Sequence, residues 1–159
     1  MHRQVFSTVQ VLGIGNGILT DDSAGLYVIE RLKKTGVPAH VTLTSGGTGG
    51  IAIVDLLEPV DSLVVVDAFV TGRAPGSVFV LDFQDTEEVG RSANLGLAHG
   101  FDLATVLTLY KDMLDGRHPE KVTLVGIEAQ DITTFSTRCT EPVEEGIAKA
   151  ADLIRNHLI

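Results

Sequence analysis

Residues 9–25, VQVLGIGNGILTDDSAG, join an apolar run to a glycine-rich turn and then to two adjacent carboxylates. This order predicts a strand, a tight turn and the start of a helix, because glycine lets the backbone turn sharply and approach its neighbours closely. Such a turn often binds phosphate, but Asp21 and Asp22 stand where an anionic ligand would bind the helix start. The dinucleotide-binding pattern also fails, because Ile18 replaces its third glycine. The segment therefore predicts a site for a cation.

The bulk composition is typical of a globular protein. A chain of 159 residues can bury a sizeable core, and we expect one domain over residues 1–159. A net charge of -9 with only 12 lysines and arginines argues against a nucleic-acid partner, because phosphate binding needs clustered cations. We find no apolar run of the roughly 20 residues that a membrane span needs, and no signal peptide. The prediction is a cytoplasmic protein without a membrane partner.

Several familiar catalytic motifs are missing from the sequence. Neither the GxSxG elbow of serine hydrolases nor the HExxH helix of zinc peptidases occurs. Cys139 is the only cysteine, which excludes an internal disulfide framework and a CxxC metal or redox motif. We interpret Cys139 as a small, half-buried apolar side chain in preference to a nucleophile.

Apolar runs alternate with helical patterns along the chain, which predicts an α/β sandwich with a mostly parallel sheet. The link TGRAPG, residues 71–76, is too short to hold a crossover helix, so the strand after it should run antiparallel. We expect residues 84–97 to form a loop. The predicted strands are 5–14, 40–45, 63–68, 77–83 and 122–128, and the predicted helices are 22–35, 51–57, 101–114 and 142–158.

Three side chains of metal-binding type should converge at the carboxyl ends of the first and third strands. Asp22 follows the first strand, Asp67 ends the third, and His99 precedes the helix predicted at 101–114. The connections leave these two strands toward opposite faces, which opens a crevice between them. Two carboxylates and an imidazole can bind a divalent nickel, zinc or iron ion and leave positions for water or substrate.

Each of these residues also has an ordinary explanation. Asp22 could be the N-cap of the following helix. His99 could be an exposed loop residue beside two glycines. Asp67 is harder to dismiss, because an ionised aspartate is rarely buried without a partner. Asp21 and Asp102 are the nearest substitutes if one ligand is misassigned.

Five motifs resemble those of the hydrogenase maturation endopeptidases, in the family's order and over nearly the whole chain. GIGNGILTDDSAG (13–25) is similar to the family's GxGNxLxxDDGxG signature, and GGTGG (46–50) to its GGTxG turn. LVVVDA (63–68) resembles its aspartate-ended strand, and HGFDLATVL (99–107) its histidine-bearing helix start. VGIE (125–128) resembles a further strand.

The resemblance implies a five-stranded sheet of order 2-1-3-5-4 with the fourth strand antiparallel. It also implies that Asp22, Asp67 and His99 contact nickel carried by the substrate, with no organic cofactor. The substrate would be the large-subunit precursor of a nickel-iron hydrogenase, which loses a C-terminal tail. Many members carry an acidic residue at the position of Ser45, so this chain cannot use a carboxylate there.

The mechanism and the function class both have alternatives. The metal could polarise the scissile carbonyl or activate water, or it could serve recognition only while Asp22 or Asp67 acts as general base. A nickel-binding chaperone that holds the precursor without cutting it is the leading alternative function. A general metallopeptidase ranks last.

Overall fold

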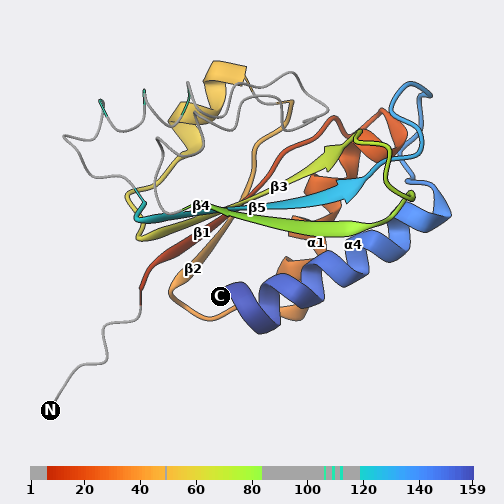
Figure 1. Cartoon of the computed structure of the whole chain (residues 1–159). Coiled ribbons are helices and arrows are strands. Elements are labelled where there is room, and N and C mark those ends of the chain that lie inside the picture. Colours follow the sequence, from red (N-terminus) through yellow and green to blue (C-terminus); the bar gives the residue numbers. More distant parts are fainter. Residues whose placement is uncertain (1–6, 49, 84–105, 107–108, 110–111, 113–118) are drawn as a thin grey trace, which may run out of the picture.

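One five-stranded sheet forms the centre of the computed structural model, which describes residues 7–48, 50–83, 106, 109, 112 and 119–159 (Figure 1). The strand order is β2-β1-β3-β5-β4, as predicted. All neighbouring pairs are parallel except β4 and β5. The antiparallel β4 follows from the short link after β3. The strands are β1 Val9–Gly13, β2 Val41–Ser45, β3 Ser62–Phe69, β4 Val78–Phe83 and β5 Lys121–Glu128.

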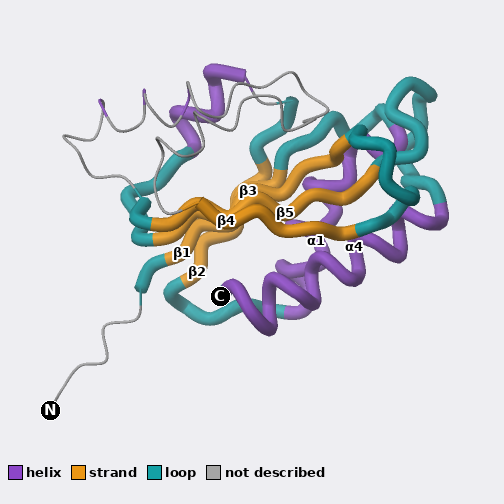
Figure 2. The backbone as a smooth tube through the Cα atoms, in the orientation of Figure 1, coloured by secondary structure: helices purple, strands orange, loops and turns teal. Residues whose placement is uncertain are grey.

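Two long helices lie side by side on one face of this sheet (Figures 1 and 2). They are α1 (Ala24–Thr35) and α4 (Glu141–Leu153), and α4 continues into a π-helical turn η3 (Ile154–Leu158). Two 3-10 helices are also present among the described residues: η1 (Thr20–Ser23) directly before α1, and η2 (Gly50–Leu56) between β2 and β3. The predicted helix start at residue 22 was wrong, because η1 separates the glycine turn from α1.

Alternate residues of each strand pack on opposite faces, because successive strand side chains point in opposite directions. The face toward α1 and α4 holds Val11, Val64 and Val125. The other face holds Leu63 and Val65, which cluster with Ile53 and Val54 of η2 and with Val106. Asp67 continues the alternation of positions 63 and 65. Its side chain therefore belongs to the face that η2 and Val106 cover.

Some predicted elements lie outside the described residues. This holds for the loop at 84–97 and for most of the helix at 101–114, where only positions 106, 109 and 112 are described, and these are helical. No helix among the described residues is long and apolar enough to cross a membrane.

Glycines bring α1 directly against the strand ends. A Cβ at Gly25 would collide with the carbonyl oxygens of Ile14 and Val66, so only glycine permits this approach. The two glycine turns also meet, since Gly15 N donates to Gly47 O at 2.7 Å. Through these contacts the start of α1 lies beside the carboxyl ends of β1 and β3.

Candidate functional site

Asp67 is a buried carboxylate near the carboxyl end of β3. Asp67 is 1% exposed, and its Oδ1 accepts a hydrogen bond from Ala68 N at 2.8 Å. Gly126 of β5 stands opposite it in the sheet, and Phe79 of β4 stands opposite Gly126. An aspartate enclosed by apolar strands is costly for folding, which favours a functional reason for its presence.

Asp22 lies in η1, which packs against β3. The glycine turn wraps its backbone: Asn16 N donates to Asp22 O at 3.2 Å, and a Cβ at Gly15 would crowd the same oxygen. The residue is 5% exposed. The N-cap explanation of Asp22 was wrong, because Ser23 occupies the N-cap position of α1. Asp22 and Asp67 thus come from elements that meet at one edge of the sheet.

His99 and Asp102 lie outside the described residues. Val106, seven positions after His99, is 3% exposed and packs on the sheet face to which Asp67 belongs. Within the described part of the chain, no three His, Cys, Asp or Glu side chains are grouped closely enough to hold a metal ion.

Asp21, one residue before Asp22, has a structural role. Its buried carboxylate accepts hydrogen bonds from the backbone nitrogens of Gln130 and Asp131, both at 2.9 Å, and of Thr140 at 2.7 Å. The Thr140 hydroxyl donates to it as well. These bonds direct the Asp21 carboxylate to the loop between β5 and α4, residues 129–140. Because its carboxylate already accepts these hydrogen bonds, Asp21 is a poor substitute for Asp22 as a metal ligand.

Thr20 is a residue that the sequence analysis missed. Its φ of 43° lies in the left-handed region, which is unusual for a β-branched side chain. Thr20 N donates to Ser136 O at 3.1 Å, and the Thr20 hydroxyl donates to Thr134 O. Loop 129–140 therefore holds the strained backbone immediately before the two aspartates, as is common at functional sites. No local sequence signal reveals this conformation.

Hydrogen bonds within loop 129–140 give it a fixed shape. Asp131 accepts bonds from the backbone and hydroxyl of Thr133 and from the backbone of Thr134. Hydrogen bonding from Thr134 and Thr133 lowers the pKa of Asp131 to about 2. Asp131 is therefore charged at any pH near neutrality, and its turn persists there.

Glu128, the last residue of β5, fixes the turn that follows β3. Its carboxylate accepts from Thr71 N at 2.8 Å, from Gly72 N at 2.9 Å and from the Thr71 hydroxyl at 2.7 Å. Arg73 donates to the same hydroxyl, and its guanidinium lies 4.2 Å from the centre of the Phe79 ring. The characteristic VGIE strand thus supports the chain beyond Asp67.

Comparison with known proteins assigns the family. The sequence model of the hydrogenase maturation proteases (HycI) matches residues 26–157. The chain belongs to the hydrogenase maturation protease family. It is 34% identical to the hydrogenase 2 maturation protease of Escherichia coli over 75% of this chain and 71% of that protein. It is 32% identical to the hydrogenase expression/formation protein HupD of Bradyrhizobium diazoefficiens, over 91% of this chain and 74% of that one.

Solved structures agree with this assignment. The maturating endopeptidase HybD of Escherichia coli superimposes with a TM-score of 0.77 at 31% identity, covering 92% of this chain and 89% of that one. HybD of Thermococcus kodakarensis shares the fold at a TM-score of 0.75 and 22% identity, over 92% and 95% of the two chains. The predicted sheet order and the peptidase activity are thus confirmed at the level of the family.

Cys139 is the one thiol that a cysteine-peptidase mechanism could use in this protease. It is 9% exposed, lies within the core under α1 and α4, and donates weakly to Thr20 O at 3.5 Å. Burial raises the pKa of the Cys139 thiol, and the nearby charges of Asp21 and Glu144 raise it further. A thiol that stays protonated is a poor nucleophile, which confirms its interpretation as a small apolar side chain.

We expect the native protein to react with iodoacetamide at pH 7.5 at least about 100-fold more slowly than the urea-unfolded chain, because the thiolate fraction and access are both low. Mass spectrometry of quenched samples measures the rate. The Cys139→Ala variant should keep its peptidase activity. Rapid labelling of the folded protein, or loss of cleavage in this variant, would contradict the buried structural role.

Proposed function

We propose that this protease removes the C-terminal extension of a nickel-iron hydrogenase large-subunit precursor and recognises nickel that the precursor already carries. The observation that supports this most directly is that η1, which carries Asp22, packs against β3, which carries Asp67. Both aspartates are almost fully buried, at 5% and 1% exposure. Membership in the hydrogenase maturation proteases supports the class of substrate.

The chemistry of the three residues suits such a substrate. In this proposal Asp22, Asp67 and His99 contact the nickel of the precursor. The carboxylates offset its charge, and a neutral imidazole adds a directed nitrogen. Because the protease contributes only three ligands, the nickel can keep its ligands from the precursor. The protease therefore contacts the nickel only while the precursor is docked.

Two routes to peptide hydrolysis are open to this arrangement. In the first, the nickel polarises the scissile carbonyl or activates the attacking water. In the second, nickel positions the precursor only, and Asp22 or Asp67 takes the proton of the water as general base. A change in the metal bound to the precursor separates them: the cleavage rate follows the Lewis acidity of the metal in the first route alone.

The decisive experiment incubates the purified protease with nickel-loaded and with nickel-free precursor and measures the mass of each product. We expect a mass loss equal to the C-terminal tail in the nickel-loaded sample only. Unchanged mass in both samples would favour a chaperone that binds without cutting. Equal cleavage in both samples would show that the protease does not recognise the nickel of the precursor.

A further inference from the structure

Two exposed apolar residues precede the two partners of a β-bridge beside η1. Leu19 and Ser136 form a parallel β-bridge, closed by Ser136 N to Ile18 O at 3.0 Å and Thr20 N to Ser136 O at 3.1 Å. This bridge sets the backbones of Ile18 and Phe135 in neighbouring chain segments, roughly 5 Å apart. Ile18 is 55% exposed and Phe135 is 78% exposed. We call these two residues the apolar pair.

The backbone that carries the apolar pair is held firmly. Loop 129–140 is tied to the Asp21 carboxylate at both ends, through Gln130, Asp131 and Thr140. Ser136 bonds across the bridge on one side and to Arg138 N on the other. An aromatic side chain on a fixed backbone loses little entropy on binding, which is the property of a binding hot spot.

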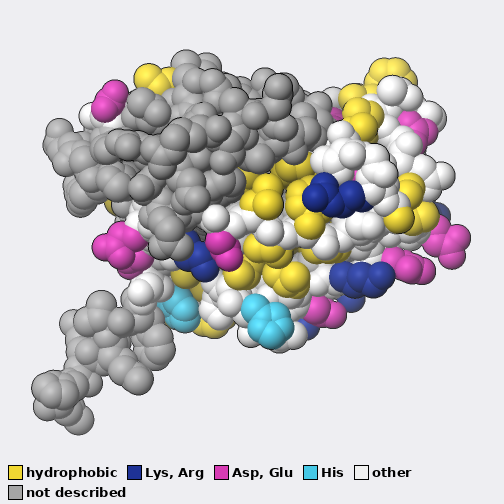
Figure 3. All heavy atoms as spheres, in the orientation of Figure 1, with side chains coloured by type: hydrophobic (Ala, Val, Ile, Leu, Met, Phe, Trp, Pro, Cys, Tyr) yellow, Lys and Arg dark blue, Asp and Glu magenta, His cyan; other side chains and the backbone are white. Residues whose placement is uncertain are grey.

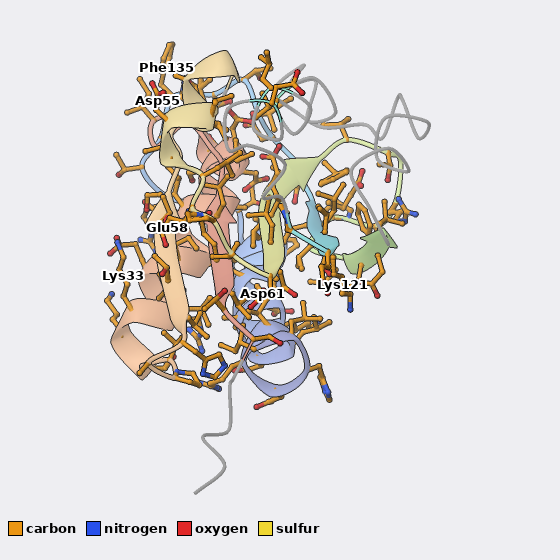
Figure 4. All side chains as sticks on the ribbon, turned by 90° about the vertical axis from the view of Figure 1, so that its left-hand side faces the viewer. Lys33, Asp55, Glu58, Asp61, Lys121 and Phe135 are labelled. Carbon is orange, nitrogen blue, oxygen red and sulfur yellow. The ribbon has the colours of Figure 1, made fainter. Side chains whose placement is uncertain are left out.

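The apolar pair belongs to the rim of the candidate site. Ile18 stands four residues before Asp22 in the chain, and η1 connects them. In Figure 4, Phe135 lies at the top of the molecule, away from Lys33, Asp61 and Lys121. Figure 3 shows hydrophobic side chains on the surface at the upper right, where Figure 1 places the loop after β5.

We propose that the apolar pair is an anchor that inserts into an apolar hollow on the folded body of the precursor, beside the cleavage junction. This inference rests on the proposed function. A side chain that is 78% exposed projects as a knob and does not line a pocket. A projecting side chain is buried by a partner surface that is concave and complementary in shape. A folded surface offers such a concave site, and a flexible tail does not. Any protein that presents a peptide bond to Asp22 must also cover the adjoining rim.

The test compares wild-type and Phe135→Ser proteases on two nickel-loaded precursors. One precursor has its natural tail. In the other, the tail beyond its first three residues is a Gly-Ser sequence of equal length. We expect KM to rise about tenfold or more for both precursors in Phe135→Ser, with kcat nearly unchanged, as for loss of a hot-spot side chain. The thermal unfolding midpoint should not change, because Phe135 contributes little to the core.

Leu56→Ser serves as the matched control, because Leu56 is a 37% exposed apolar residue of η2, which carries neither Asp22 nor Asp67 and no part of loop 129–140. Its KM should equal that of the wild type. An unchanged KM in Phe135→Ser, an equal rise in Leu56→Ser, or a rise limited to the natural tail would each overturn the anchor. Failure of the proposed function looks different, because the wild-type protease itself would then leave both precursors uncut.

Discussion

The Asp67→Asn variant is expected to leave the precursor uncut over times in which the wild-type protease cleaves it completely. Asparagine has the size of aspartate and can still accept the hydrogen bond from Ala68 N through its oxygen. It lacks the negative charge that either route needs, for contact with nickel or for removal of a proton from water. We expect kcat/KM to fall by at least about 1,000-fold, which corresponds to roughly 4 kcal/mol of transition-state stabilisation.

Mass spectrometry of the precursor over time measures this loss, and thermal unfolding shows whether the fold persists. Asp82→Asn is the control within the same sheet. Asp82 of β4 forms an ion pair with Lys121 of β5 at 3.4 Å, and its side chain is 48% exposed. An exposed ion pair contributes little to stability. Its cleavage rate should match the wild type. Normal cleavage by Asp67→Asn would disprove a chemical or metal-binding role for Asp67.

Much of the fold follows from local features of the sequence. The buried strand β3 is a continuous apolar run, and the short link after it forces β4 to run antiparallel. The start of α1 was not predictable in the same way. The left-handed Thr20 that delays the helix is held by Ser136 and Thr134, more than 100 residues further along the chain. Only the folded structure brings that loop into contact with η1.

The candidate site also contains residues that the sequence could predict and residues that it could not. Asp67 could be predicted because a charge at the end of an apolar strand is unusual in itself. The different roles of Asp21 and Asp22 could not be derived from the pattern, because the Asp21 partners Gln130, Asp131 and Thr140 are remote in sequence. The assignment of His99 stays a prediction.

Neighbouring substitutions at Asp21 and Asp22 should therefore have opposite effects. In Asp21→Asn, an amide nitrogen replaces one carboxylate oxygen and cannot accept hydrogen bonds. The backbone donors on that side, Gln130 N and Asp131 N or Thr140 N, lose their acceptor in a buried place. An unsatisfied buried donor costs about 1–3 kcal/mol, so we expect the free energy of unfolding to fall by about 3 kcal/mol. Urea unfolding followed by circular dichroism measures this change.

Asp22→Asn should lower the free energy of unfolding by less than Asp21→Asn does, because the bonds that hold loop 129–140 go to Asp21. It should nevertheless lose cleavage as Asp67→Asn does, because the same charge is missing from the same edge of the sheet. Near-normal cleavage by folded Asp22→Asn, together with lost cleavage by folded Asp21→Asn, would exchange the roles of the two residues. Under the proposed function, Asp21 supports the loop and Asp22, one residue later in the chain, contacts the substrate.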